Sequence, residues 1–226
     1  MSDAEPPPHP VRKPFGRWRR WLPRAAFESV LIVFSVVLAL MLTDWADRRR
    51  TAAEVAEVRG YFIAEIRANR AILVSDFILP HHRRLHAAFG TAAEGEPTQD
   101  KAMQAYREVF RTGIHVAPLR DAVWRSAETG DLLAEMPIED LFLLADIYKA
   151  QGTLADMSQG FIAGTPGVLS ALESGEGVRA AIATGQLHLS DVVASEEGLV
   201  RLYDRALAKL DRDASNRTDD AAPAKR

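Results

Sequence analysis

The sequence predicts an all-α fold in which one N-terminal transmembrane helix continues into a long helix and an α-helical bundle. Residues 25–45 form an almost uninterrupted apolar stretch, and apolar side chains recur at spacings of three and four through most of the remaining chain. Almost no segment shows the six-residue alternation that is typical of a half-buried strand. The 226 residues suit a membrane anchor plus one globular domain. We therefore expect a disordered tail (1–24), a transmembrane helix (25–45), a helical bundle domain (46–211) and a second disordered tail (212–226).

Composition and charge distinguish the two tails from the body. Residues 1–24 hold six of the twelve prolines and six of the 28 Lys and Arg residues, against two carboxylates. Residues 212–226 are polar and Ala-rich and have no apolar face. Residues 46–226 carry 22 basic and 27 acidic side chains, and this mildly acidic balance argues against binding of nucleic acid by the body.

The apolar stretch 25–45 has the length and composition of a membrane span. Between residues 30 and 42, Ser35 is the one side chain that is not apolar. A helix of 21 residues at about 1.5 Å each measures roughly 32 Å, which matches a hydrocarbon core of about 30 Å. Trp18 and Trp21 precede the stretch and Trp45 ends it, as expected for anchors at the membrane interface.

Two other interpretations of this stretch are a buried core helix and a cleaved signal peptide. A core helix needs no basic run before it, and residues 43–46 offer a poor cleavage site. An uncleaved signal anchor is therefore expected. The amino side of the span carries six nearby Lys and Arg residues, and the carboxyl side carries four (Arg48, Arg49, Arg50 and Arg59). This bias predicts a cytoplasmic N-terminus and an exported body.

Two features of the anchor suggest polar contacts in the membrane. The basic tail can lie against anionic lipid headgroups, at about 1 kcal/mol for each Lys or Arg near the surface. Glu28 lies one turn into the span, where burial of a carboxylate is costly. It is expected at headgroup depth beside Arg24, and the alternative is a polar contact that pairs two anchors.

Helical periodicity predicts the elements of the body in order. A long helix is expected over 47–77, continuous with the span, and Pro80 is expected to end it. Thr98 is a good N-cap for a helix that closes at Gly113. A third helix is expected from Pro118 to Gly130, and a fourth starts at Pro137 with a wide apolar stripe.

The stretch that follows this fourth helix contains several helix breakers and predicts short helices or loops. A last helix is expected from near Ser190, with an apolar face that includes Leu199, Tyr203 and Leu210. The breakers are Gly152, Gly160, Gly164, Pro166 and Gly167.

Several classes of chemistry lack the residues that they need. The chain contains no cysteine, which excludes disulfides, thiolate metal sites and cysteine nucleophiles. It contains no phosphate-binding loop, no dinucleotide fingerprint and no nucleophile elbow. No pair of carboxylates is placed as acid and base. We therefore expect no enzyme, no cofactor and no catalytic residue.

One cluster has the spacing of metal ligands. His82 and His86 at positions i and i+4 would share a helix face and suit Zn²⁺ or Ni²⁺. No third ligand is evident apart from Asp76, and Arg83 and Arg84 oppose a bound cation. Surface histidines are the favoured interpretation, so no metal site is assigned.

Two further side chains on apolar faces suggest a role. Asn69 lies on the apolar face of the long helix, where a buried amide can fix register or oligomeric state as it does in coiled coils. The favoured alternative is an amide that is capped by a neighbouring loop. Trp124 is expected in the core rather than as a platform for a ligand.

The residues at both ends of the span carry a resemblance to a known group of proteins. Residues 28–33 (ESVLIV) open the span, 43–49 (TDWADRR) close it, and 65–69 (EIRAN) follow about a helix length later. With 122–127 (AVWRSA), Thr129, Gly130, Leu132, Met136 and Pro137, the chain resembles a family of uncharacterised bacterial single-span proteins over roughly residues 27–150. The resemblance implies an N-terminal anchor and a helical domain of unknown function, and it brings no catalytic residues.

These features together predict a single-pass protein of the bacterial inner membrane. We expect a protein-interaction or scaffold module of the envelope, which binds another protein or itself and carries no chemistry of its own. The alternative is a ligand-sensing helical domain that signals through a membrane partner. A sizeable internal pocket would favour the sensor, and an exposed apolar patch would favour the scaffold.

Overall fold

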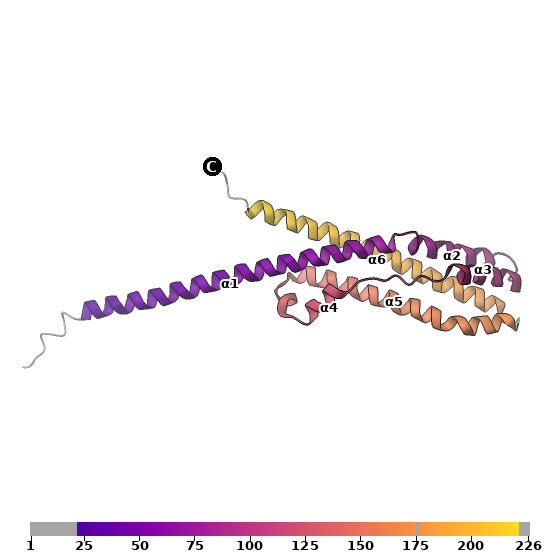
Figure 1. The fold of residues 1–226 in the computed structure, drawn as a ribbon, viewed down its shortest axis with the longest axis horizontal. Helices are drawn as coiled ribbons and strands as arrows, with labels where there is room; N and C mark the ends of the chain where they lie inside the picture. The colour runs from indigo at the N-terminus through magenta and orange to yellow at the C-terminus, as the bar shows by residue number, and fades with distance from the viewer. Residues whose placement is uncertain (1–21, 175–176, 222–226) are drawn as a thin grey trace, which may run out of the picture. The chain divides into compact units, whose positions relative to one another are not determined.

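The computed structural model describes residues 22–174 and 177–221, and every element in these ranges is a helix. The all-α fold is therefore confirmed for the described residues. Figure 1 shows the order of the elements along the chain, which are α1 (Leu22–Leu73), α2 (Leu79–Ala93), α3 (Gln99–Thr112), α4 (Ala122–Glu128), the 3₁₀ helix η2 (Asp131–Glu135), α5 (Ile138–Glu173) and α6 (Val178–Ala221). The predicted tail 1–24 lies almost entirely outside the described residues.

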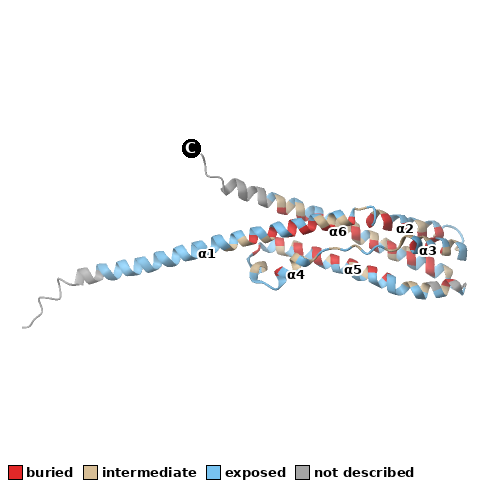
Figure 2. Cartoon of the chain, in the orientation of Figure 1, coloured by how far each residue is buried: buried red, intermediate tan, exposed pale blue. Residues whose placement is uncertain are grey.

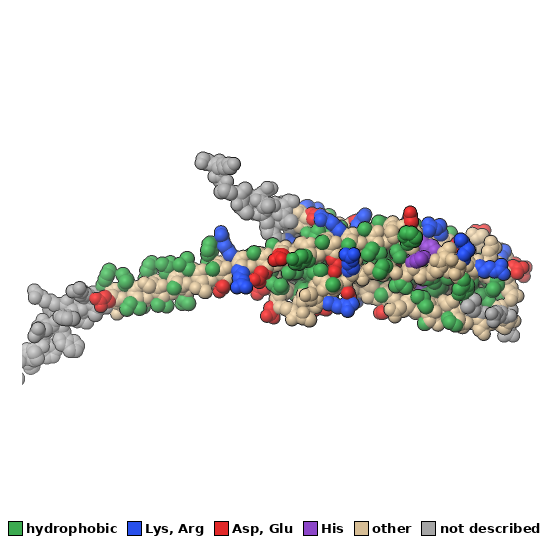
Figure 3. All heavy atoms as spheres, viewed as in Figure 1, with side chains coloured by type: hydrophobic (Ala, Val, Ile, Leu, Met, Phe, Trp, Pro, Cys, Tyr) green, Lys and Arg blue, Asp and Glu red, His purple; other side chains and the backbone are tan. Residues whose placement is uncertain are grey.

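The chain divides into two compact units, and the first comprises residues 1–52. Its described part belongs to α1, which contains an 18-residue window with a mean hydropathy of 2.1 and no buried residue. This helix is long and apolar enough to cross a membrane, and Figure 3 shows hydrophobic side chains along it. The Ser35 and Thr43 hydroxyls donate to the carbonyls of Leu31 (2.8 Å) and Ala39 (3.0 Å), so both polar groups are satisfied within the helix.

The second unit, residues 53–226, is the body, and two hydrophobic cores stabilise it. The first core joins α1, α4, the first half of α5 and the second half of α6. The second core joins α2, α3, the second half of α5 and the first half of α6. Figure 2 shows the buried residues along these helices. Large members of the first core are Phe62, Ile66, Leu144, Ile147, Tyr203 and Leu210, and those of the second are Leu85, Phe89, Tyr106, Phe161, Leu172 and Leu189.

A buried ion cluster ties three helices of the first core together. Asp140 on α5 is fully buried and pairs with Arg59 of α1, which is 3 % exposed. Its other carboxylate oxygen accepts a hydrogen bond from Lys209 Nζ of α6 at 2.5 Å. Asp140 lies in the first turn of α5, and its two partners are distant in the sequence.

The prediction of short helices or loops after residue 150 is wrong. α5 continues without a break through Gly152, Gly160 and Pro166 to Glu173. Intrinsic preferences of about 1 kcal/mol per Gly and about 3 kcal/mol per Pro are weak against the packing of an apolar face. Here Leu154, Phe161 and Leu172 are all buried in the two cores, and their burial outweighs the helix breakers.

The last helix also starts earlier than expected, at Val178 rather than near Ser190. Its first turns bury Ala181, Ile182 and Leu189 in the second core. Gly185 sits in this segment because a Cβ there would collide with the Phe89 ring. At the other end α6 extends to Ala221, whereas a disordered tail was expected from Arg212, and residues 222–226 lie outside the described range.

Two helix ends agree with the sequence and two differ. Thr98 caps α3 by accepting from the Lys101 N–H, and Gly113 follows α3 in the left-handed region at φ 77°. α1 ends at Leu73, and Pro80 lies in the first turn of α2 instead of ending the long helix. α4 begins at Ala122 rather than at Pro118, because the residues before it are held in a non-helical segment.

Candidate binding site

A non-helical segment, residues 113–121, connects α3 to α4, and we call it the strap. Such a segment has to find partners for its backbone N–H and C=O groups outside a helix. The Gly113 N–H donates to the Val109 carbonyl at 2.7 Å, and the Leu119 N–H donates to the Ala117 carbonyl at 2.8 Å. The Asp121 carbonyl accepts from the Arg125 N–H of α4, and the partner of Arg120 comes from α1.

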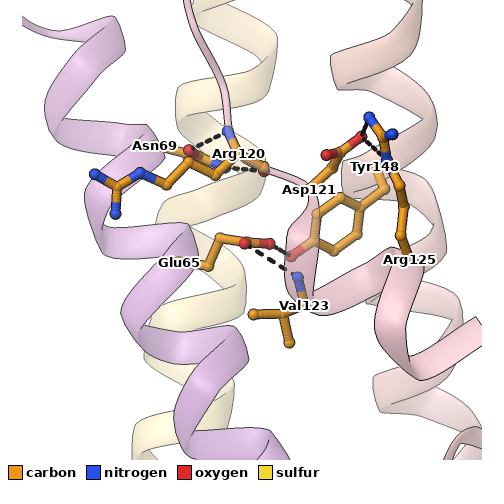
Figure 4. A network of polar contacts seen from close by, with 7 residues as sticks. All are labelled: Glu65, Asn69, Arg120, Asp121, Val123, Arg125 and Tyr148. Carbon is orange, nitrogen blue, oxygen red and sulfur yellow. Dashed lines mark hydrogen bonds and ion pairs between the residues drawn. The ribbon is translucent and has the colours of Figure 1, made fainter.

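Asn69 of α1 holds the strap by its backbone. Its side-chain N–H donates to the Arg120 carbonyl at 2.7 Å, and its side-chain oxygen accepts from the Arg120 N–H at 2.8 Å. Asn69 is fully buried, and Figure 4 shows this pair of bonds. The favoured interpretation of the sequence, an amide capped by a neighbouring loop, is confirmed.

Glu65, one turn before Asn69, joins α1 to two other helices. One carboxylate oxygen accepts the Tyr148 O–H of α5 at 2.7 Å, and the other accepts the Val123 N–H at the start of α4 at 3.2 Å (Figure 4). Burial, and then the hydrogen bond to Glu65, raise the pKa of Tyr148 well above its ordinary value. Tyr148 is therefore a permanent donor to Glu65 at neutral pH.

A cavity of about 620 Å³ lies between the strap, α4 and α5. Trp124 and Tyr148 form part of its wall, and their rings stack with centroids 5.1 Å apart and planes at 18°. Trp124 was expected in the core, but it is only half-buried: it packs against the edge of the first core and also lines the cavity. The other lining residues are Val116, Ala117, Leu119, Asp121, Arg125, Glu128, Ala145, Lys149, Gln151, Gly152, Leu154, Ala155 and Ser158.

The wall of this cavity is mostly apolar, and its charged side chains are exposed or half-buried. Arg125 pairs with Asp121 at 2.5 Å, and both lie beside Tyr148 in Figure 4. Gln151 is buried and donates to the Tyr203 hydroxyl at 2.9 Å. Burial raises the pKa of Tyr203, so this hydroxyl stays neutral. The arrangement can hold a partly apolar molecule of about fragment to drug size, since sites for such molecules typically measure about 300–1,000 Å³.

The interpretation of the histidine cluster as surface histidines is wrong for His81 and His82, which are both buried against other elements of the body. His82 is buried, and its Nδ1 lies 2.8 Å from Glu196 Oε1 of α6, while His86 is half-exposed. His81 Nε2 lies 2.8 Å from the Gly113 carbonyl. Among the described residues no group of three His, Asp or Glu side chains is placed to hold a metal ion.

Sequence analysis did not identify Glu65, Tyr148 or Glu196 as polar partners. Glu65 and Glu196 are far from Tyr148 and His82 in the chain, at separations of 83 and 114 residues. One signal was available for Glu65, because it falls between Phe62 and Asn69 on the apolar face of the long helix. A carboxylate at such a position needs a buried partner.

Comparisons with protein-family models, with curated proteins and with solved structures give no match to this chain. The resemblance to bacterial single-span proteins therefore stays a prediction.

Proposed function

We propose that this chain is a single-pass membrane protein whose helical body binds a small ligand in the strap cavity and acts by binding rather than by chemistry. One observation carries the proposal. Tyr148 forms part of the cavity wall, and its hydroxyl is held by Glu65 of α1. Because α1 also contains the apolar segment, an occupant of the cavity acts on the same helix that anchors the protein.

The coupling follows from the double role of Glu65. Its two oxygens hold Tyr148 of α5 and the N-terminus of α4 at the same time. An occupant that moves the stacked Trp124 and Tyr148 rings has to stretch at least one of these bonds. The ligand then favours a second arrangement of α4 and α5 against α1. The size of this shift is set by the difference between the affinities of the ligand for the two arrangements.

The proposed location is the bacterial inner membrane. It is supported by the apolar helix, by the basic tail that precedes it and by the excess of Lys and Arg on the amino side. We propose a cytoplasmic N-terminus and a body on the outer side. A reporter that is active only outside the cytoplasm, fused after Arg226, tests this orientation. An inactive but intact fusion in the membrane fraction would place the body in the cytoplasm.

The cavity itself is tested by filling it. Gly152 lines the cavity, and a Cβ at this position meets nothing within 4 Å, so Gly152→Leu adds a bulky side chain to the lining at a position that has room for its Cβ. Gly160→Leu is the matched control, because Gly160 lies on the same helix with equally open space and does not line the cavity.

The probe is a panel of fluorinated aromatic fragments, observed by fluorine NMR against the full chain in lipid nanodiscs and against empty nanodiscs. The proposal expects fragments that bind the wild type and Gly160→Leu, and lose about tenfold or more in affinity for Gly152→Leu. Absence of binding to the wild type, or equal binding to both variants, would overturn it.

A second candidate function is the interaction or scaffold module, and exposed apolar side chains favour it. Ile138 and Phe142 are 59 % and 64 % exposed, one turn apart on α5. Tyr61 of α1 is 53 % exposed and lines an apolar hollow of about 340 Å³ with Val58, Ala122, Val123, Ser126, Ala127 and Leu132. This function predicts that Phe142→Ser weakens self-association or capture of a membrane partner and leaves fragment binding in the cavity unchanged.

A further inference from the structure

A buried polar layer separates the two hydrophobic cores of the body. On α2 it consists of His81 and His82, which lie between Ile78 of the first core and Leu85 of the second. On α5 the buried Ser158 lies between Leu154 and Phe161 in the same way. On α6, His188 and the buried Glu196 lie on either side of the change from Leu189 to Val192. The layer therefore marks the boundary between the half of the body that contains α2 and α3 and the half that contains α1 and α4.

The layer contains more proton-binding groups than charges to balance them. His82 and Glu196 are each 1 % exposed and contact one another through Nδ1 and Oε1. On the far side of each group, His82 Nε2 and Glu196 Oε2 are buried without a hydrogen-bond partner among the described residues. The same holds for His188 Nε2, whose ring stacks on Phe161 at 4.4 Å.

The charged side chains around the layer form ion pairs or hydrogen bonds with other groups, or are exposed to solvent. On the α2 side, Arg83 pairs with Glu197 of α6 at 2.7 Å, and Arg84 donates to the Asp76 carbonyl. From α3, Glu108 pairs with Arg111. The strap contributes the His115 ring, 5.0 Å from the ring of His81, and α6 contributes the exposed Asp191. The neighbours from α5, Ser158 and Phe161, are uncharged. Glu196 is thus the one buried carboxylate in this described layer that can balance an imidazolium.

We propose that this polar layer is an acid-sensitive latch, which holds α2 and α3 on α6 at neutral pH and releases them on acidification while the first core stays folded. Glu196, the buried carboxylate of the layer, is already engaged by His82. Protonation of His81 or His188 then adds a cation to a layer that has no second buried carboxylate, and burial of an unpaired charge is costly. The charge is relieved when α2 leaves α6 and the imidazoles reach water.

The direction of the pH effect follows from the burial of these imidazoles. Burial lowers the pKa of both His81 and His188 below the ordinary value of 6.5. In the opened state the same imidazoles take up a proton at their ordinary pKa, so the opened state binds more protons below about pH 6.5. The closed layer therefore has its full stability above about pH 6.5, and it loses stability as the pH falls below this value.

The two halves have different polar contacts, so the latch can open one without the other. The first half is held by the cluster of Arg59, Asp140 and Lys209 and by the Glu65–Tyr148 bond, none of which contains a histidine. In the second half, the polar contacts between α2 and α6 are the His82–Glu196 contact and the surface pair of Arg83 and Glu197. This inference does not depend on the proposed ligand.

Hydrogen exchange of the full chain in lipid nanodiscs at about pH 7.5 and pH 5.5 tests the latch. After correction for the intrinsic pH dependence of exchange, residues 85–92 and 181–189 of the second core should lose about tenfold or more of their protection at the lower pH. Residues 62–69 and 144–151 of the first core should keep theirs. Equal protection of the second core at both pH values, or an equal loss in both halves, would overturn the proposal.

Substitutions in the layer separate titration from general destabilisation. The double variant His81→Gln with His188→Gln should lose most of the pH dependence, whereas His86→Gln, on the half-exposed side of α2, should retain it. Retention of the full pH dependence by the double variant contradicts the proposal. If the double variant does not fold, His188→Gln alone must reduce the pH-dependent loss of protection by severalfold.

Discussion

The side-chain amide of Asn69 forms two hydrogen bonds with the main chain of Arg120, which lies 51 residues further along the chain. A long helix thereby holds a segment that has no regular structure of its own. The same helix, one turn earlier, holds the start of α4 through Glu65. These two side chains hold the strap and the start of α4 (Figure 4), which line the cavity together with α5.

Replacement of Asn69 by Leu should destabilise the body strongly. The substitution removes both hydrogen bonds of the buried amide to the part-buried main chain of Arg120, at about 0.5–1.5 kcal/mol for each bond. Urea unfolding followed by circular dichroism measures the loss. Gln104→Leu, at an exposed position of α3, is the control and should change stability by about 0.5 kcal/mol or less. Equal stability of Asn69→Leu and wild type would show that the strap is not held by this amide.

Asp140 is predicted to be the most sensitive charged position of the body. Asp140→Ala leaves the buried Arg59 guanidinium without its carboxylate, which costs about 3–5 kcal/mol when a buried pair is broken. The neighbouring Glu139 is the matched control, because its side chain is 81 % exposed and contacts the same Lys209 at 3.4 Å. Glu139→Ala should cost about 1 kcal/mol or less. Thermal unfolding of the two variants side by side distinguishes them, and similar losses would contradict a buried cluster.

Glycines of α5 and α6 should respond to alanine in opposite directions. At Gly185 a new Cβ collides with the Phe89 ring, and overpacking of this kind costs about 1–3 kcal/mol. At Gly160 a Cβ meets nothing within 4 Å, so Gly160→Ala should stabilise the helix by about 0.5–1 kcal/mol. Chemical unfolding of both variants checks the sign of each change. A stabilised Gly185→Ala would show that α2 and α6 are not in close contact here.

Alkaline pH should unfold the body before its buried tyrosines ionise. Burial raises the pKa of Tyr106 to about 12, and burial also raises the pKa of Tyr148 and Tyr203. In the unfolded chain these phenols ionise near their ordinary pKa of 10.0. The folded state therefore loses stability as the pH rises above about 10. Tyrosinate absorbance and circular dichroism, recorded together, should change in one transition apart from a signal of the exposed Tyr61. Full tyrosinate absorbance in a chain that is still helical would contradict this burial.

The sequence pattern indicates some of these contacts and gives no indication of others. The buried amide of Asn69 was visible, because the residue stands on an apolar face with a fixed period. The continuity of α5 was not visible, because Gly152, Gly160 and Pro166 argue locally against a helix and the packing that outweighs them involves α6 and, in the second core, α2 and α3. The partners of Asp140 and His82 were equally hidden, since charge and spacing along the chain say nothing about which distant helix supplies Lys209 or Glu196.

The sequence by itself determined the all-α class, the apolar N-terminal helix, the caps at Thr98 and Gly113 and the buried character of Asn69, since all depend on residues within a few turns of one another. Tertiary structure alone decided the lengths of α5 and α6, the strap cavity, the ion cluster and the histidine layer. The physical reason is that burial is a property of the assembled bundle. Helix propensity contributes tenths to a few kcal/mol per residue, and the apolar surface shared between distant helices decides where such weak preferences are overruled.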